Sequence, residues 1–190
     1  MAEPRFKGLV YINHRDWFDE RLGAGWFTSV VREIDPEWPD RLLPGDWYSA
    51  RPGVHAYDRA FVQIEGYESK EQMMESVAGM VALNDLNSFL RAFLFVATPK
   101  MFLRAVPKIW ATYANFGVAE VISNETGRLV VRINEIPQFV LVWTMASWRG
   151  FLVPAVQLAG GKKPRTSTRD VKPKPGTDMW EFVYELTYEA

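Results

Sequence analysis

Two histidines, His14 and His55, are the residues best suited to acid–base chemistry or metal binding in this chain of 190 residues. Neither has a second histidine or a carboxylate four residues later, the spacing that a helical zinc site needs. His14 lies near Asp16 and Asp19 in the sequence, a grouping more typical of a charged surface than of a ligand set. The chain has no cysteine, which excludes thiol catalysis, thiolate metal sites and disulfides. We therefore expect no metal site.

The motifs of common catalytic sites are also missing. The sequence has no Gly-x-Ser-x-Gly elbow and no Walker loop, and the Gly-Ala-Gly at 23–25 lacks the third glycine of a dinucleotide-binding turn. Spacing alone does not exclude a Ser-His-Asp triad, but no motif supports one. We predict a protein that is not an enzyme and that holds no cofactor.

Aromatic side chains form the next group with chemical potential, since the chain has eight Trp, seven Tyr and twelve Phe. Such side chains pack cores, and they also line ligand pockets and interfaces. Five of them fall on two predicted helices that flank a hairpin, where they would line an apolar pocket with polar tips: Trp110, Tyr113, Phe116, Trp143 and Trp148. Ordinary core packing is the alternative, and the sequence leaves both open.

Three further groups offer surfaces rather than chemistry. Segment 36–57 has four prolines and two glycines and is typical of an ordered loop with short helical pieces, in which Trp38, Trp47 and Tyr48 are candidates for a partner surface. A second group consists of polar residues within a largely apolar helical region, and helix capping and a solvated helix edge explain them best: Asn84, Asp85, Asn87 and Arg91. The basic stretch 162–174 is better explained as a charge ladder beside the last strand than as a site for an acidic partner.

Composition limits the class of protein. The formal net charge of −1 gives no long-range field that would attract nucleic acid. The longest apolar run, 139–159, contains Ser147, Arg149, Pro154 and Gln157, so it predicts a buried helix and not a membrane span. With no apolar signal core at the start, we expect one cytoplasmic domain over 1–190.

The elements that must position these residues can be read from periodicity. Residues 6–12 fit a short strand or the first turns of a helix. Helices are expected from 70 to a break at Asn84-Asp85, then to 94, and again from the cap Thr98 and Pro99. Residues 118–124 and 128–135 predict a hairpin, and 139–159 a helix.

The final strand, 179–189, gives the clearest pattern. Trp180, Phe182 and Tyr184 lie on its apolar face, while Glu181 and Glu185 lie on a face that needs cationic neighbours. The fold class is therefore α+β, mainly helical over 1–116, with hairpin, helix and final strands over 117–190. A helical layer packs on one face of an antiparallel sheet of about four strands, most of them in the C-terminal half.

The sequence resembles a paralogous family of myxobacterial proteins of similar length. The likeness lies in segments at 6–10, 42–48, 89–90 and 98–103, in Pro107, Trp110, Tyr113, Gly117, Gly127, Arg128 and Pro137, and in Trp180-Glu181-Phe182. That family is distantly similar to four-vinyl-reductase-type domains, Bet3-like trafficking subunits and haem nitric-oxide-binding domains. The resemblance implies helices packed on an antiparallel sheet, used for small-molecule sensing or dimeric assembly.

The functional residues of those relatives do not carry over. The haem domain needs an axial histidine on a central helix and a Tyr-x-Ser-x-Arg motif, whereas here no histidine follows His55 and the strand reads Val-Arg-Ile-Asn at 131–134. The acyl-cysteine of Bet3-like proteins is impossible without cysteine.

Two functional hypotheses follow. The first is a regulatory or sensory domain that is not an enzyme and binds a small apolar ligand or a protein partner. The alternative is a homodimeric scaffold or adaptor that acts through its surface, with no ligand pocket. They differ in whether Trp143 and Trp148 face a cavity or a partner.

Overall fold

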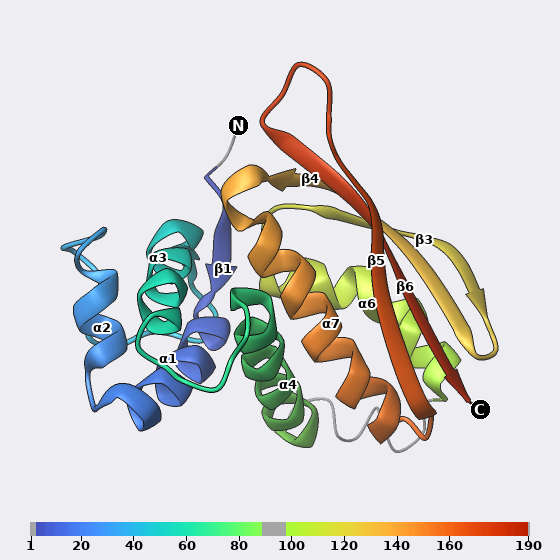
Figure 1. Cartoon of the computed structure of the whole chain (residues 1–190), viewed down its shortest axis with the longest axis horizontal. Helices are drawn as coiled ribbons and strands as arrows, with labels where there is room; N and C mark the ends of the chain where they lie inside the picture. The colour runs from blue at the N-terminus through green and yellow to red at the C-terminus, as the bar shows by residue number, and fades with distance from the viewer. Residues whose placement is uncertain (1–2, 89–97, 190) are drawn as a thin grey trace.

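The computed structural model describes residues 3–88 and 98–189. Figure 1 shows helices α1, α2 and α3 on one side and a sheet on the other, with α4 and α7 between them and β1 running through the middle. The hydrophobic core is continuous from α1 through α4 and α7 to the inner face of the sheet.

The first elements resolve the choice between strand and helix at the N-terminus, because both are present. Strand β1, Arg5–Lys7, pairs antiparallel with β2, Trp47–Ser49, and helix α1, Gly8–Leu22, starts directly after β1. Helix α2 follows at Trp26–Val31.

Helix α3, Ala50–Phe61, begins within segment 36–57, where short helical pieces are predicted, and continues past its end as a regular helix. The Ser49 hydroxyl accepts the Arg51 N–H at 3.3 Å and caps the helix. Pro52 then lies in the first turn, where a backbone N–H has no partner within the helix. Pro52 is therefore compatible with the start of a regular helix.

The predicted helix break at Asn84-Asp85 is also wrong, because α4 runs without interruption over Lys70–Ser88. The Asn84 amide donates to the Met80 sulfur at 2.8 Å, so it does not compete with the helix backbone. The predicted helix that follows begins within α4, and its part from 89 to 94, Arg91 included, lies outside the described residues.

Two other helices start at, or within two residues of, the positions that the sequence predicts. Helix α6, Pro99–Tyr113, begins at the cap Thr98, whose hydroxyl accepts the Met101 N–H at 3.3 Å. A short 3-10 turn, Gln138–Val140, leads into α7, Leu141–Leu158, which packs along α4. In Figure 1, α7 crosses the inner face of the sheet.

The four-stranded sheet confirms the predicted fold class. Its strands are β3, Val118–Glu125, β4, Arg128–Pro137, β5, Lys162–Pro173, and β6, Met179–Glu189. They are antiparallel in the order β3-β4-β6-β5. The sheet thus belongs entirely to the C-terminal half and carries helices on one face.

The two faces of β6 divide as predicted. Phe182, Tyr184 and Leu186 are fully buried. On the outer face, ion pairs join β6 to the flanking strands: Arg128–Glu185 at 2.7 Å, Lys172–Glu181 at 3.2 Å and Lys163–Glu189 at 2.9 Å. Each such exposed pair stabilises by at most about 1 kcal/mol, so the ladder mainly keeps this face solvated.

Among the described helices, one is long and apolar enough to cross a membrane. It lies at Gln138–Leu158, where an 18-residue window has a mean hydropathy of 1.4 and half of that window is buried inside the fold. That burial is typical of a core helix.

Candidate functional site

A cavity with about 80 Å³ of free volume lies between the N-terminal helices and the sheet-bearing half. Five elements contribute to its wall, and we call it the aromatic cavity. Its described lining residues are Phe6 from β1; Val10 and His14 from α1; Ala78 and Val81 from α4; Val106, Ile109, Trp110 and Tyr113 from α6; and Trp143, Ser147, Trp148, Phe151 and Leu152 from α7.

Helical spacing brings these side chains to one place. On α7, Trp143, Ser147 and Phe151 are four residues apart and therefore share a face. On α6, Trp110 and Tyr113 are three apart, and they meet α7 ring against ring. The centroids of Trp110 and Trp148 are 5.5 Å apart, and those of Tyr113 and Phe151 are 6.1 Å apart.

Four of the five predicted ligand residues lie together in this wall: Trp110, Tyr113, Trp143 and Trp148. The fifth, Phe116, lies behind it. Its ring packs on Phe6 at 5.0 Å, and its carbonyl oxygen accepts the Trp110 Nε1–H at 2.8 Å. Phe116 therefore supports the wall by holding Trp110 in place.

His14 lines the cavity, although the sequence analysis assigned it to a charged surface. Its predicted neighbours turn elsewhere: Asp16 pairs with Arg15, and Asp19 accepts the N–H groups of Gly25 and Phe27. His14 is only 3% exposed. A signal was present, because Val10, His14 and Phe18 keep helical spacing on the buried face of α1.

The polar atoms of the aromatic cavity are few and poorly satisfied. Burial alone lowers the pKa of His14 to about 3, with no ion pair or hydrogen bond contributing. The Trp148 Nε1–H is buried and has no hydrogen-bond partner within the described residues. Leaving such a donor unpaired costs about 1–3 kcal/mol.

The predicted partner surface is corrected at one position. Trp38 is 2% exposed and packs against Tyr11 and Tyr48 in the core, so it presents no surface. The Tyr48 hydroxyl accepts the Leu43 N–H at 2.9 Å, and Trp47 is 36% exposed beneath the Lys7 ammonium. Only Trp47 of the three remains a large exposed ring.

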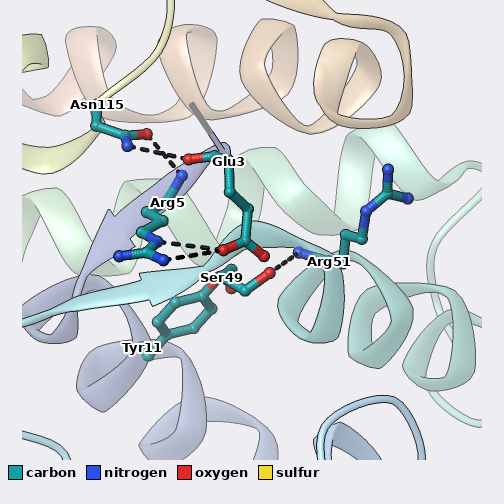
Figure 2. A network of polar contacts seen from close by, with 6 residues as sticks. All are labelled: Glu3, Arg5, Tyr11, Ser49, Arg51 and Asn115. Carbon is teal, nitrogen blue, oxygen red and sulfur yellow. Dashed lines mark hydrogen bonds and ion pairs between the residues drawn. The ribbon is translucent and has the colours of Figure 1, made fainter. Parts of the chain in front are cut away.

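Strand β1 closes one side of the aromatic cavity, and polar contacts hold it (Figure 2). The Phe6 ring lies 4.1 Å from Trp143. Just before Phe6 in the chain, the Arg5 N–H donates to Asn115 Oδ1 at 2.7 Å, and Asn115 Nδ2 donates to the Glu3 carbonyl at 3.0 Å. Asn115 thus ties β1 to the end of α6.

Replacing Asn115 with alanine is expected to lower the free energy of unfolding by about 1–2 kcal/mol, because two exposed hydrogen bonds to β1 are lost. Urea denaturation measures this change, and hydrogen exchange at the Arg5 amide should speed up. Asn115→Asp keeps the acceptor and should retain protection at Arg5. Equal exchange in all three proteins would contradict the assignment.

The second histidine lies away from the cavity. His55 Nε2 contacts Glu33 Oε2 at 2.8 Å on the outer side of α3. Within residues 3–88 and 98–189, no three His, Cys, Asp or Glu side chains gather in a way that would hold a metal ion.

Comparison with known proteins identifies the fold. An oxygen-binding H-NOX domain related to soluble guanylate cyclases aligns with a TM-score of 0.70 at 8% identity, over 97% of this chain and 95% of that one. A mutant H-NOX protein from K. algicida gives 0.70 at 10% identity, and one from S. oneidensis gives 0.67 at 10%, each over 97% of both chains. No family model and no curated protein matches the sequence.

The H-NOX likeness confirms, at the level of fold, the expected similarity to haem nitric-oxide-binding domains. At such low identity it shows the fold alone. The likeness to the myxobacterial family, to four-vinyl-reductase-type domains and to Bet3-like subunits stays a prediction.

Haem, which the H-NOX structures concern, does not fit the residues present here. Helix α6 turns Trp110 and Tyr113 toward the cavity and carries no histidine. The free volume of about 80 Å³ is far below the roughly 300–1,000 Å³ of cofactor and drug-sized pockets. Tryptophan rings fill the space between α6 and α7.

Proposed function

We propose that this protein is a sensory or regulatory domain, not an enzyme, that binds a small and largely apolar molecule in the aromatic cavity. The observation that carries the proposal is the wall of that cavity. Fourteen described residues from five elements line it, and none carries a charged group other than the titratable His14. Convergent aromatic walls with a few polar atoms are typical of ligand sites.

Two other observations support the proposal. The H-NOX fold is one that oxygen-binding domains use. In addition, Trp143 and Trp148 are each 5% exposed and line the cavity, so their rings are not available to a protein partner. This arrangement favours ligand binding over the scaffold hypothesis.

The cavity connects the two halves of the fold, which suits a sensor. Val10 and His14 come from α1, while Trp110 and Trp148 come from α6 and α7. A ligand that touches both halves stabilises one arrangement of them by its differential affinity. Sensing then needs no catalytic group.

Replacing Ser147 with leucine is expected to abolish binding of small apolar probes. Ser147 lines the cavity, and the larger side chain would occupy much of its free volume. Xenon is a suitable probe because it enters dry apolar cavities, and ¹²⁹Xe NMR would detect binding to the native protein. Ser147→Ala leaves the volume nearly unchanged and should bind xenon like the native chain.

Native mass spectrometry of protein from its own host supplies a second measurement. A small molecule should copurify with the native chain and with Ser147→Ala, and be lost from Ser147→Leu. Xenon binding that is unaffected by Ser147→Leu would contradict the proposed site, as would a native chain that binds neither xenon nor any copurified molecule.

A further inference from the structure

The aromatic cavity is closed to solvent on the side of β1, α1 and α4. The described lining residues on these three elements are each 6% exposed or less: Phe6, Val10, His14, Ala78 and Val81. A molecule could pass here only if a whole element moved, because buried side chains interlock at close packing. Among the elements that line the cavity, α6 and α7 are left as the place for an entrance.

The half-buried residues of the cavity wall all come from α6 and α7. They are Ile109, Trp110, Tyr113, Ser147 and Phe151, each of intermediate exposure although each lines the cavity. Ser147 gives the clearest indication, because its side chain has a single heavy atom beyond Cβ. A side chain this short that both lines the cavity and is partly exposed brings solvent close to the cavity wall.

Two aromatic rings meet at this partly exposed edge. The ring centroids of Tyr113 on α6 and Phe151 on α7 are 6.1 Å apart, with an angle of 61° between the ring planes. Phe151 lies one helical turn after Ser147, so the two side chains share a face of α7. The edge contact between the rings therefore joins α6 to α7 beside Ser147.

Phe151 is the ring that can rotate aside at the lowest cost. The half-buried Trp110 is held, because its Nε1–H donates to the Phe116 carbonyl at 2.8 Å. Tyr113 carries a hydroxyl group and has a further interaction partner. A phenylalanine ring has no hydrogen-bonding group, so its rotation breaks only van der Waals and ring-edge contacts.

We propose that small molecules enter the aromatic cavity between α6 and α7, and that the Phe151 ring, packed against Tyr113, is a gate that limits their rate of entry. The inference rests on the proposed function and adds how the site is reached. A gate slows entry and exit by the same factor, so it changes the rate of ligand exchange and not the affinity. Rates are therefore the quantity to measure.

The rate constant for xenon entry into the full chain, measured by ¹²⁹Xe exchange NMR, tests the gate. Phe151→Ala is expected to raise it about three- to tenfold, the factor that corresponds to the loss of one edge contact between rings. Leu152→Ala is the matched control, because Leu152 also lines the cavity but is only 2% exposed. Both variants enlarge the cavity, and only the first opens the proposed path. Leu152→Ala should therefore leave the entry rate unchanged.

Phe151→Leu keeps an apolar side chain in place and removes the ring edge, so it should also accelerate entry if Phe151→Ala does not fold. Native rates in both Phe151 variants, or equal acceleration in Leu152→Ala, overturn the inference. If xenon binds and Ser147→Leu abolishes that binding while the Phe151 variants exchange at the native rate, the proposed function survives and only the gate fails. A native chain that binds no xenon removes both.

A second readout leaves the gate intact. The chain has no cysteine, so a single introduced thiol reports the accessibility of one position. Ser147→Cys should react with methyl methanethiosulfonate, a small uncharged thiol reagent, at least about tenfold faster than Val10→Cys, because reaction at the buried α1 wall needs an opening motion. Each rate is divided by the rate of the same variant in urea. Equal ratios at the two positions would show that the α1 side is open as well, and would overturn the inference.

Discussion

Replacing Gly150 with alanine is expected to lower the free energy of unfolding by about 3 kcal/mol. Gly150 lies in α7 where that helix crosses α4. A Cβ atom there would overlap the Glu75 carbonyl oxygen and come within 2.8 Å of the Ala78 Cβ. Because the first clash is with backbone, no side-chain rotation relieves it, and the two helices must move apart.

The higher helix propensity of alanine opposes this steric cost, but it is the smaller of the two effects. Alanine is favoured over glycine inside a helix by about 1 kcal/mol, so the steric cost decides the sign. Urea denaturation at neutral pH measures the difference, and the midpoint should fall with little change in slope. A variant as stable as the native chain would show that α4 and α7 are not packed this closely.

Gly79→Ala is the matched control on the facing helix. A Cβ at Gly79 would lie 3.5 Å from the Gly150 carbonyl oxygen, which is ordinary van der Waals contact. This variant should therefore gain up to about 1 kcal/mol from helix propensity. The pair separates helix propensity from close packing, since the same substitution is made on two sides of one contact.

The close contact between α4 and α7 at Gly150 also affects the aromatic cavity. Gly150 is two residues from Trp148, and the neighbouring Arg149 Nε pairs with Glu75 Oε1 at 2.6 Å. Shifting α7 would carry its tryptophans away from α6. We expect Gly150→Ala to weaken xenon binding together with stability, whereas Gly79→Ala keeps native binding and loses no stability.

The parts of the fold that could be predicted are those set by local periodicity. Alternation along 179–189 identified both faces of β6, and the acidic face correctly required cationic strands beside it. The cap and proline at Thr98 and Pro99 identified the start of α6. In each case the residues that decide the structure are adjacent in sequence.

The incorrect predictions have a common physical origin, because they rest on residues that are compatible with two local structures. Pro52 fits a loop and also the first turn of a helix, and the capping Ser49 decided for α3. Asn84 fits a break and also an exposed helix position. Which of the two structures forms depends on the residues that pack against the segment, and the periodicity of the sequence carries no information on these contacts.

The same limit applies to the site. Four predicted aromatics line the cavity because α6 and α7 each present one face. Phe116 and Trp38 could not be placed correctly, since Phe116 follows the end of α6 and Trp38 depends on contacts with Tyr11 and Tyr48. His14 was obscured by nearby aspartates whose side chains face away from it.

Loss of stability on acidification is the second large effect expected, and His14 is its cause. The ordinary pKa of 6.5 falls to about 3 in the folded state because the cavity desolvates the imidazolium. Below about pH 6.5, His14 is therefore protonated in the unfolded chain while it stays neutral in the folded chain. The stability linked to His14 is complete above pH 6.5 and is lost as the pH falls toward 3.

The size of the effect follows from the shift. Each pH unit inside this window costs about 1.4 kcal/mol, so His14 should account for a loss of about 2 kcal/mol at pH 5. Urea denaturation at pH 7.5 and pH 5 measures it. Carboxylates in ion pairs also titrate at low pH, so the comparison must be made between variants and not on the native chain alone.

His14→Leu removes the titrating group while keeping an apolar side chain in the wall, and its stability should change by about 2 kcal/mol less between the two pH values. His55→Leu retains His14 and should keep the native dependence. If His14→Leu and His55→Leu lose equal stability on acidification, then His14 is charged or solvated in the folded state. A charged His14 would also attract anions, so the neutral character of the cavity depends on this result.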